Sequence, residues 1–462
     1  MSSELELAHF VNHIKYNDLP AEVVKATKRD IFDTIGVGLS GSQAPGISQM
    51  VDYAKEMGGK ESGTILVSGF KAPPVNVALV NGGMCHARDY DDTHDTARVH
   101  TGAAVIPAAL AVAEHIGGVS GKELINAVTL GIEIHCRLGL TNKFHIGWAL
   151  PALYGYFGAA TAAGKLLGLD VEGMLNAWGI AYSQAAGNLE TLASGGLTKR
   201  LQLGFAASAG VLSGLLAQKG ITGAKNSFEG KAGIFQLYQR GEYEAAPLTE
   251  ALGKGFEVTN LSFKPYPCDR GSQSGIDAAL EIARKYNISP EQIAEVRVRL
   301  GSHTYEVCGE PIEVKRKPRN VVDAQFSTPY TVACALVRKK VDLSDFTDES
   351  IKDRAVLKVA SQVYPIFDPE IDRELGKAIP PTQVEVQTKS GEVYSAKVIF
   401  AKGHPKNPMT DEEFEAKFRS CATSADKEVS PKIVNNLMDR LNNLEQVADI
   451  RQITSLFCPV SQ

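Results

Sequence analysis

The chain has 462 residues, of which 44% are hydrophobic and 22% are charged, and this composition is ordinary for a soluble globular protein with a large core. The formal net charge of −5 gives no reason to expect nucleic acid or an anionic membrane as a partner. Seven scattered cysteines without a CxxC pair argue against a disulfide framework.

The N-terminal segment MSSELELAHF carries acids where a secretory signal would carry a basic region and an apolar run. Pro107, Glu114 and His115 interrupt the best candidate for a membrane span. We therefore expect a cytoplasmic protein that uses neither a signal peptide nor a membrane anchor.

The first 250 residues have a helical pattern. A short amphipathic helix is predicted over 4–16, and a second helix is predicted to begin at Pro20 and to stop at the glycines of GVGLSGS (36–42). The segments 155–170 and 202–220 repeat Gly, Ala and Ser at spacings of three and four, which allows helices to pack closely.

The pattern changes near residue 256. A proline-rich segment is followed by a predicted helix around Ile276–Ala283, by a strand over 294–300, and by two strands around a Ser-Gly turn within 382–400. Helical periodicity then returns. The sequence thus predicts a mainly α protein, with a large all-helical domain (1–258 and 402–462) and a smaller α+β domain (259–401).

One stretch, HARDYDDTHDTARVH (86–100), concentrates four aspartates and three histidines. If the preceding helix ran over 76–92, Asn81, Cys85 and Asp89 would share one face, and Thr93 would point the same way as Asp89. The next helix is predicted over 101–116, with its N–H groups and positive dipole end beside His100. This arrangement suits a carboxylate ligand next to a histidine that moves a proton.

Three other interpretations of this stretch remain open. DDTHD (91–95) matches the DDxxD motif of helical isoprenoid synthases, but we find no second acidic motif to complete a magnesium site. His94 and Asp95 match the core of an HD-type phosphohydrolase, but further ligands at helical spacing are missing. A solvated acidic loop without chemistry is the third. We accordingly expect no metal.

Six segments, in order along almost the whole chain, resemble the MmgE/PrpD family, which includes 2-methylcitrate dehydratase, cis-aconitate decarboxylase and iminodisuccinate epimerase. They are LPAEVVKATKRDIFDTIGVGLSGS (19–42), HARDYDDTHDTARVHTGAAVIPAALAVAE (86–114), LTKRLQLGFAASAG (197–210), FKPYPC (263–268), AQFSTPYTVACAL (324–336) and KGHPKNPMTDEEFEAKF (402–418). The resemblance implies a large helical domain, a smaller α+β lid domain, a homodimer, and chemistry at the domain interface without metal or cofactor.

Carried over by this resemblance, the family's pocket corresponds here to Asp89, Thr93, His100, Lys199, Lys264 and Tyr330. His100 is expected to act as general acid or base, and Asp89 to orient it or to act as base itself. Lys199 and Arg200, at a helix start, would face an anionic substrate. Tyr330 would donate a proton and Lys264 would bind a distal carboxylate. Each residue also has an ordinary structural alternative. His100 could be a buried structural histidine, Asp89 a helix cap or the partner of an arginine, and Tyr330 a core residue with a satisfied hydroxyl. Lys199, Arg200 and Lys264 could be exposed charges.

The sequence also departs from the family pattern. Ala149 stands where many members have a histidine, and His145 is the nearest candidate to replace it. Asp269 and Gln273 stand where the decarboxylase branch has histidines, and one extra residue separates Thr93 from His100. These departures separate the chain from cis-aconitate decarboxylation in particular.

We therefore expect a lyase that moves a proton at carbon next to a carboxylate, most simply a 2-methylcitrate dehydratase-like hydro-lyase acting on a small di- or tricarboxylate. A dicarboxylate epimerase or racemase is the second hypothesis, and a decarboxylase is a third. A non-catalytic helical binding protein is the alternative from another class.

Overall fold

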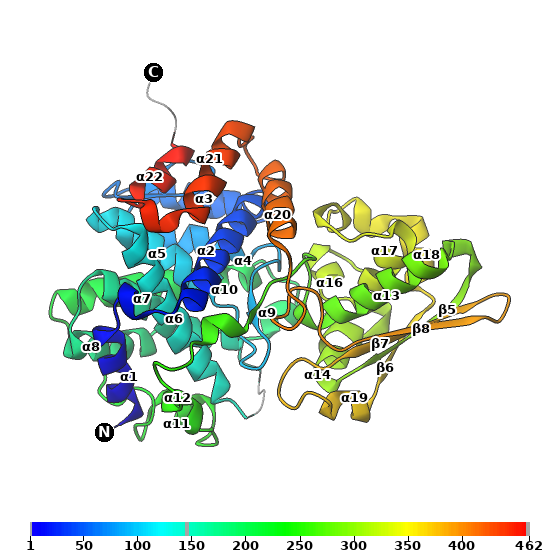
Figure 1. Cartoon of the computed structure of the whole chain (residues 1–462), viewed down its shortest axis with the longest axis horizontal. Coiled ribbons are helices and arrows are strands. Elements are labelled where there is room, and N and C mark those ends of the chain that lie inside the picture. Colours follow the sequence, from blue (N-terminus) through cyan, green and yellow to red (C-terminus); the bar gives the residue numbers. More distant parts are fainter. Residues whose placement is uncertain (1, 144–146, 459–462) are drawn as a thin grey trace. The chain divides into compact units, whose positions relative to one another are not determined.

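The structure is a computed structural model that describes residues 2–143 and 147–458. The chain forms two compact units, a larger one comprising Met1–Leu261 with Asp411–Gln462 and a smaller one comprising Ser262–Thr410 (Figure 1). The larger unit therefore takes its sequence from both ends of the chain.

The larger unit is helical, as predicted. Its helices are α1 (Ser3–His13), α2 (Ala21–Gly41), α3 (Ile47–Met57), α4 (Pro74–His86), α5 (Gly102–Ile116), α6 (Gly121–Leu140), α7 (Leu150–Leu166), α8 (Val171–Tyr182), α9 (Glu190–Ala193), α10 (Thr198–Gln218), α11 (Ile234–Tyr238), α12 (Ala246–Thr249), α20 (Asp411–Thr423), α21 (Pro431–Asn442) and α22 (Arg451–Thr454). Strands β1 (Gly63–Thr64) and β2 (Lys71–Ala72) pair antiparallel, and β3 (Thr93–His94) lies in the acidic stretch.

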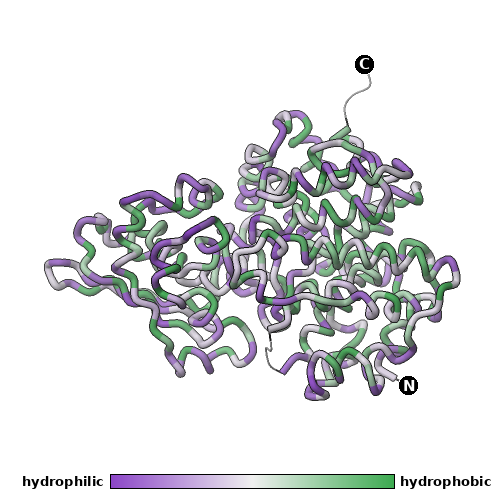
Figure 2. Tube along the Cα trace, turned by 180° about the vertical axis from the view of Figure 1, so that it is seen from behind, coloured by the Kyte–Doolittle hydropathy of each residue, from purple (hydrophilic) through white to green (hydrophobic). Residues whose placement is uncertain are grey.

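Helices α4, α5, α7 and α10 pack against one another and form the centre of this unit. A side chain at Gly204 of α10 would place its Cβ 2.3 Å from the Leu79 carbonyl oxygen of α4, so the two backbones approach closely because that side chain is absent. By length and composition α10 could cross a membrane, but 61% of its apolar window is buried inside the protein, as in a core helix. Figure 2 shows long hydrophobic stretches along the helices of this unit.

Helix α2 runs through Gly36 and Gly38 and ends at Gly41, inside the segment 36–42 where it was predicted to stop. A Cβ on Gly36 would lie 2.7 Å from the Phe418 ring of α20, so this glycine serves helix packing rather than helix termination. The buried ion pair between Lys417 and Asp33, with Nζ 2.8 Å from Oδ1, also joins α20 to α2.

The smaller unit contains one sheet in the order β6–β5–β7–β8. The strands are β5 (Ile293–Leu300), β6 (Val363–Phe367), β7 (Thr382–Thr388) and β8 (Val393–Val398), after the two-residue β4 (Leu261–Ser262), which begins at the unit boundary. Its helices are α13 (Gln273–Tyr286), α14 (Ser302–Thr304), α15 (Ile312–Arg316), α16 (Val321–Gln325), α17 (Thr328–Arg338), α18 (Arg354–Ala360) and α19 (Pro369–Arg373).

Strand β5 pairs parallel with β6 and antiparallel with β7, and β7 pairs antiparallel with β8, so the predicted strand over 294–300 and the predicted hairpin within 382–400 are confirmed. Burial alternates along β7, as expected for a sheet with one face toward a core. Helices α13 and α17 pack against each other and against strands of the sheet (Figure 1).

The C-terminal boundary of the smaller unit differs from the predicted one at residue 401. Residues 402–410 belong to the smaller unit rather than to the helical one. The Phe263 N–H donates to the Gly403 carbonyl at 2.9 Å, and the Lys402 N–H donates to Asp277 Oδ2 at 2.7 Å. These hydrogen bonds attach residues 402–410 to the smaller unit. A hydrophobic pattern in the sequence cannot predict them.

Candidate active site

The acidic stretch is a compact loop rather than a helical extension. Helix α4 ends at His86, and both Asp89 (φ 49°) and Arg98 (φ 54°) adopt left-handed backbone conformations. The chain then reverses, because the His94 N–H donates to the Val99 carbonyl at 2.9 Å. The prediction of a helix over 76–92 is therefore wrong beyond residue 86. Asn81 does not join a shared face with Asp89, because its side chain binds the backbone of Leu66 and Thr64.

Helix α5 begins at Gly102, one residue after the predicted start at Thr101, but its N-terminus is already occupied by an anion of the protein. Asp92 Oδ2 accepts from the Thr101 N–H at 2.9 Å and from its hydroxyl at 2.7 Å, and Oδ1 accepts from the Gly102 N–H at 2.9 Å. An aspartate at a helix N-terminus satisfies the unpaired N–H groups and the helix dipole. The expected carboxylate-binding site at this helix end is thus filled by Asp92.

His100 is oriented by two neighbours in the loop. Its Nδ1 lies 2.7 Å from the Asp92 carbonyl oxygen and 3.1 Å from the Thr93 hydroxyl. A carbonyl oxygen only accepts, so Nδ1 carries a proton and, in the neutral ring, Nε2 carries the lone pair. The His100 side chain keeps 18% of its surface exposed, so it remains reachable.

A second histidine, His86, accompanies His100. Its Nδ1 donates to Asp91 Oδ2 at 2.7 Å, and the same oxygen lies 3.8 Å from His100 Nδ1. The two imidazole rings are 5.4 Å apart, centroid to centroid. The Asp91 carboxylate that lies beside both rings is fully buried. The pairing of His86 with Asp91 does not follow from the sequence, because it depends on the loop conformation.

Asp89 and Lys199 form a direct ion pair. Lys199 lies in the first turn of α10, and its side chain is 11% exposed against 4% for Asp89. The fold therefore brings together two predicted site residues that are far apart in sequence. The solvated-charge alternative for Lys199 is excluded, since both partners are nearly buried.

Arg200, the next residue, points elsewhere. Its guanidinium donates to the Pro45 carbonyl at 2.8 Å, and it is only 2% exposed. The neighbouring Arg88 donates to the Ser40 carbonyl at 3.0 Å. Burial, and then the charge of Arg200, lower the pKa of Arg88 to about 10. Both arginines thus bind backbone carbonyls of the α2–α3 region.

The two predicted residues of the smaller unit are buried. Lys264 has no exposed surface, so the interpretation of an exposed charge is wrong. Tyr330 lies in the first turn of α17, as expected, but its hydroxyl donates to the Asp345 carbonyl at 2.6 Å and the residue belongs to the unit's hydrophobic core. Burial raises the pKa of Tyr330 far above its usual value. These contacts match core packing with a satisfied hydroxyl rather than proton donation.

The residues at which the sequence departs from the family pattern are placed as follows. His145 lies outside the described residues. The Ala149 N–H donates to the Gly187 carbonyl at 3.3 Å, just before α7. In the smaller unit, Asp269 accepts from the Gly271 N–H, and the Gln273 amide donates to the carbonyls of Tyr266 and Cys268.

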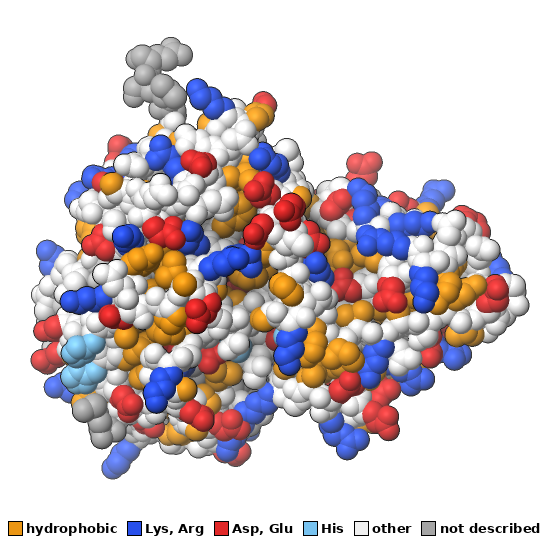
Figure 3. Space-filling view, in the orientation of Figure 1, with side chains coloured by type: hydrophobic (Ala, Val, Ile, Leu, Met, Phe, Trp, Pro, Cys, Tyr) orange, Lys and Arg blue, Asp and Glu red, His pale blue; other side chains and the backbone are white. Residues whose placement is uncertain are grey.

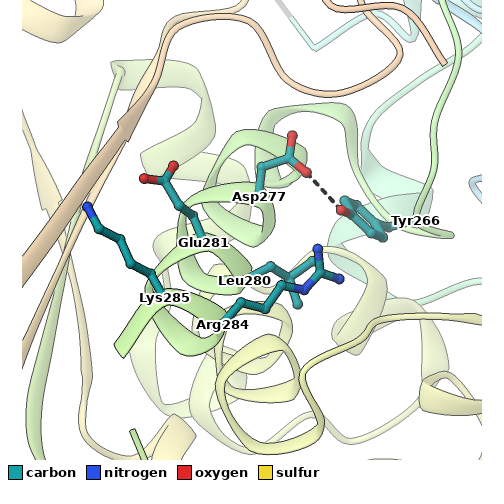
Figure 4. A pocket seen from close by; sticks show the side chains of 6 residues that line it. All are labelled: Tyr266, Asp277, Leu280, Glu281, Arg284 and Lys285. Atoms are coloured by element: carbon teal, nitrogen blue, oxygen red, sulfur yellow. Dashed lines mark hydrogen bonds between the residues drawn. The ribbon is translucent and has the colours of Figure 1, made fainter. Parts of the chain in front are cut away.

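An open pocket of about 510 Å³ lies elsewhere, on α13 of the smaller unit. It is lined by Tyr266, Asp277, Leu280, Glu281, Arg284 and Lys285, and the Tyr266 hydroxyl donates to Asp277 at 2.7 Å (Figure 4). The pocket includes none of the predicted site residues. Over residues 2–143 and 147–458, no group of three or more His, Cys, Asp or Glu side chains is arranged to hold a metal ion.

Two family models match the chain, the MmgE/PrpD N-terminal domain over residues 5–246 and the MmgE/PrpD C-terminal domain over residues 266–441. The chain belongs to the MmgE/PrpD family. The resemblance inferred from the sequence motifs is confirmed, and so is the mainly α fold with a smaller α+β part.

Curated members of the MmgE/PrpD family match over most of the chain. A cis-aconitate decarboxylase of Aspergillus terreus is 29% identical, covering 98% of this chain and 96% of its own length. The Homo sapiens cis-aconitate decarboxylase is 27% identical, with coverages of 96% and 92%. The 2-methylcitrate dehydratase of Escherichia coli K12 is 22% identical, with coverages of 79% and 78%. Both named activities are lyase reactions, and this chain is an MmgE/PrpD-type lyase.

Proposed function

We propose that the protein is a cofactor-independent hydro-lyase that removes water from a small hydroxylated di- or tricarboxylate, with His100 transferring the proton at the carbon next to a carboxylate. The observation that carries the proposal is the orientation of His100. The Asp92 carbonyl fixes its protonated Nδ1, so in the neutral ring Nε2 carries the lone pair that removes a proton.

Lys199 supports the same reaction. Removal of a proton next to a carboxylate leaves negative charge on the substrate, and a fixed cation stabilises that charge. Lys199 is held by Asp89, so the lysine is positioned before substrate binds. In this proposal Thr93 orients His100 through its hydroxyl, which lies 3.1 Å from His100 Nδ1.

Dehydration requires that the C–H bond break with its electron pair forming the double bond, while the C–O bond breaks and hydroxide leaves. His100 takes the proton from carbon, and the departing hydroxide takes a proton from an acid to leave as water. Asp91, beside both His86 and His100, would stabilise the imidazolium formed in the first step.

A second candidate is decarboxylation of an unsaturated tricarboxylate. The decarboxylases of the family share more identity with this chain, and over a larger part of it, than the dehydratases do. In this reaction the C–CO2 bond breaks, its electron pair stays on carbon, and an imidazolium such as His100 donates a proton to that carbon. The same residues would serve, with His100 starting protonated.

The test is product analysis in deuterated water with 2-methylcitrate and with cis-aconitate. Loss of water from 2-methylcitrate supports the hydro-lyase, and release of CO2 with deuterium on the product carbon supports the decarboxylase. Exchange of the proton next to the carboxylate, with no water or CO2 lost, would replace both by an epimerase. Absence of turnover and of exchange across a panel of such carboxylates would contradict the proposal.

The proposal includes a homodimer, which rests on the family resemblance alone. Sedimentation equilibrium of the purified protein tests it, and a single species with the mass of one chain would contradict it.

A further inference from the structure

Asp30, on α2, is a fully buried acid without a counter-charge. Among the residues that the structure describes, neither of its carboxylate oxygens has a hydrogen-bond partner. Asp33, on the same helix, is nearly as buried but is paired with Lys417. Burying an unpaired carboxylate is far more costly than burying the neutral acid, so a group in this position keeps its proton.

The oxygens of Asp30, Thr34 and Asp92 meet at the start of α5. A Cβ built on Gly102 would lie 3.2 Å from Asp30 Oδ1, 2.8 Å from Asp92 Oδ1 and 2.2 Å from Thr34 Oγ1. The missing side chain of Gly102 is therefore what lets α2 and the acidic loop bring these groups together. Two carboxyl groups that both lie within 3.2 Å of one buried point disfavour each other's ionised form.

The surroundings decide which of the two acids keeps the proton. Asp92 accepts three hydrogen bonds from Thr101 and Gly102 and lies at the positive end of a helix, and both favour its ionised form. Beside Asp30, the Thr34 hydroxyl lowers the pKa less than burial and the neighbouring acids raise it. Burial first, and the charge of Asp92 second, raise the pKa of Asp30 well above its usual value.

We propose that Asp30 is held as a neutral carboxylic acid whose hydroxyl donates to Asp92, and that this acid pair positions His100. Asp92 connects the two because its side chain caps α5 while its backbone carbonyl accepts from His100 Nδ1. The first half of the proposal stands by itself, and the second half rests on the proposed role of His100.

The pair also limits the charge beside the candidate site. Ionised Asp30 would repel Asp92 and would weaken the cap that holds the segment from Asp92 to Gly102. As a neutral acid, Asp30 adds a hydrogen-bond donor without adding a further negative charge near a polycarboxylate substrate.

Infrared difference spectroscopy in deuterated buffer at neutral pH tests the protonation state directly. Asp30→Asn should remove one carbonyl band of a protonated carboxylic acid from the wild-type spectrum. Asp52→Asn, at an exposed aspartate that pairs with Lys55, should remove only ionised carboxylate absorption. If Asp30→Asn also removes only carboxylate absorption, Asp30 is ionised and the proposal is overturned.

Kinetics on a confirmed substrate test the positioning role. Asp30→Ala should lower kcat by about tenfold or more with little change in KM, since small displacements of a catalytic group have large effects. Asp30→Asn, which keeps a neutral donor, should restore kcat to within about threefold of wild type. Equal loss in the two variants, with both folded, would overturn the positioning role.

The two proposals fail in different ways. If His100→Ala were fully active, both the catalytic role of His100 and the positioning role of Asp30 would be overturned. The neutral state of Asp30 would still stand if Asp30→Asn removed a carbonyl band of a protonated acid. If His100→Ala were inactive but Asp30→Ala were fully active, only the positioning role would fall.

Discussion

The acidic loop of the larger unit and helix α17 of the smaller unit bury polar side chains in different ways. In the loop, side chains bind other titratable side chains, as in His86 with Asp91 and Asp89 with Lys199. In α17 the Tyr330 hydroxyl binds a backbone carbonyl inside an apolar core. Titratable side chains are the groups that general acid–base chemistry uses, whereas a hydroxyl bound to the backbone in an apolar core stabilises the fold.

Charged side chains on the protein surface are arranged differently from those in the acidic loop. Figure 3 shows acidic and basic side chains interspersed on the face in view, which agrees with the small net charge. Exposed pairs of this kind contribute little, about 0–1 kcal/mol each. The loop is distinguished from the surface because its charges are paired in the interior.

The largest expected effect is that of His100→Ala. Loss of a general acid or base lowers kcat by about 10²–10⁴-fold, while folding should be preserved because the side chain is partly exposed. Steady-state kinetics measure kcat, and solvent deuterium exchange into the substrate should fall in parallel. His13→Ala, at a histidine near the N-terminus that contacts the carbonyl and the ring of His9, is the matched control. Near wild-type kcat and exchange would move the role to another group, with Asp89 first.

Lys417→Met should be the most destabilising of these changes. It leaves Asp33 buried without its cation and removes the donor to the Tyr90 carbonyl, which holds the acidic loop to α20. Breaking a buried pair in this way costs about 3–5 kcal/mol in free energy of unfolding. Denaturant unfolding measures it, against Lys28→Met, whose partly exposed pair with Glu445 should contribute at most about 1 kcal/mol. If both variants lost the same free energy of unfolding, burial of the ion pair would not determine how much it stabilises the fold.

Lys199→Ala should damage both binding and turnover. The lysine is proposed to stabilise negative charge on the substrate, so kcat should fall on the order of 10²-fold and KM should rise. Lys219→Ala, at the exposed opposite end of α10, should leave both constants unchanged. A loss of stability without a change in kcat or KM would make the Asp89–Lys199 pair purely structural.

Tyr330→Phe should change activity little. The hydroxyl donates to the Asp345 carbonyl, so its removal should lower the free energy of unfolding by about 1 kcal/mol and leave kcat nearly unchanged. Thermal or denaturant unfolding and steady-state kinetics of the same preparation separate the two outcomes. A large fall in kcat at unchanged stability would restore Tyr330 to the proposed site.

Removal of metal should have no effect. The acids of the DDTHD motif are engaged by protein groups, with Asp91 on His86 and Asp92 on the N-terminus of α5. Activity on a confirmed substrate should survive extended dialysis against EDTA. Loss of turnover that returns with a stoichiometric divalent ion would overturn this expectation.

Much of the architecture could be read from residue patterns. Helical periodicity located α5 and α13, and alternation located β5, β7 and β8, because both patterns report which side of an element faces a core. The six family motifs located the acidic loop and Lys199. The packing role of Gly36 could not be predicted, since a glycine looks the same in sequence whether it ends a helix or admits a neighbouring ring such as Phe418.

The sequence by itself determined the fold class, the family and the density of titratable groups at 86–100, because periodicity and local motifs depend on near neighbours along the chain. Only the tertiary structure decided the partners of those groups. Asp92 fills the helix end that was expected to bind substrate, Tyr330 enters a core, and Asp30 lies beside Asp92 although 62 residues separate them in sequence. Each of these outcomes depends on the distance between atoms that folding brings together, and that distance sets the charge and hydrogen bonding of every group in the site.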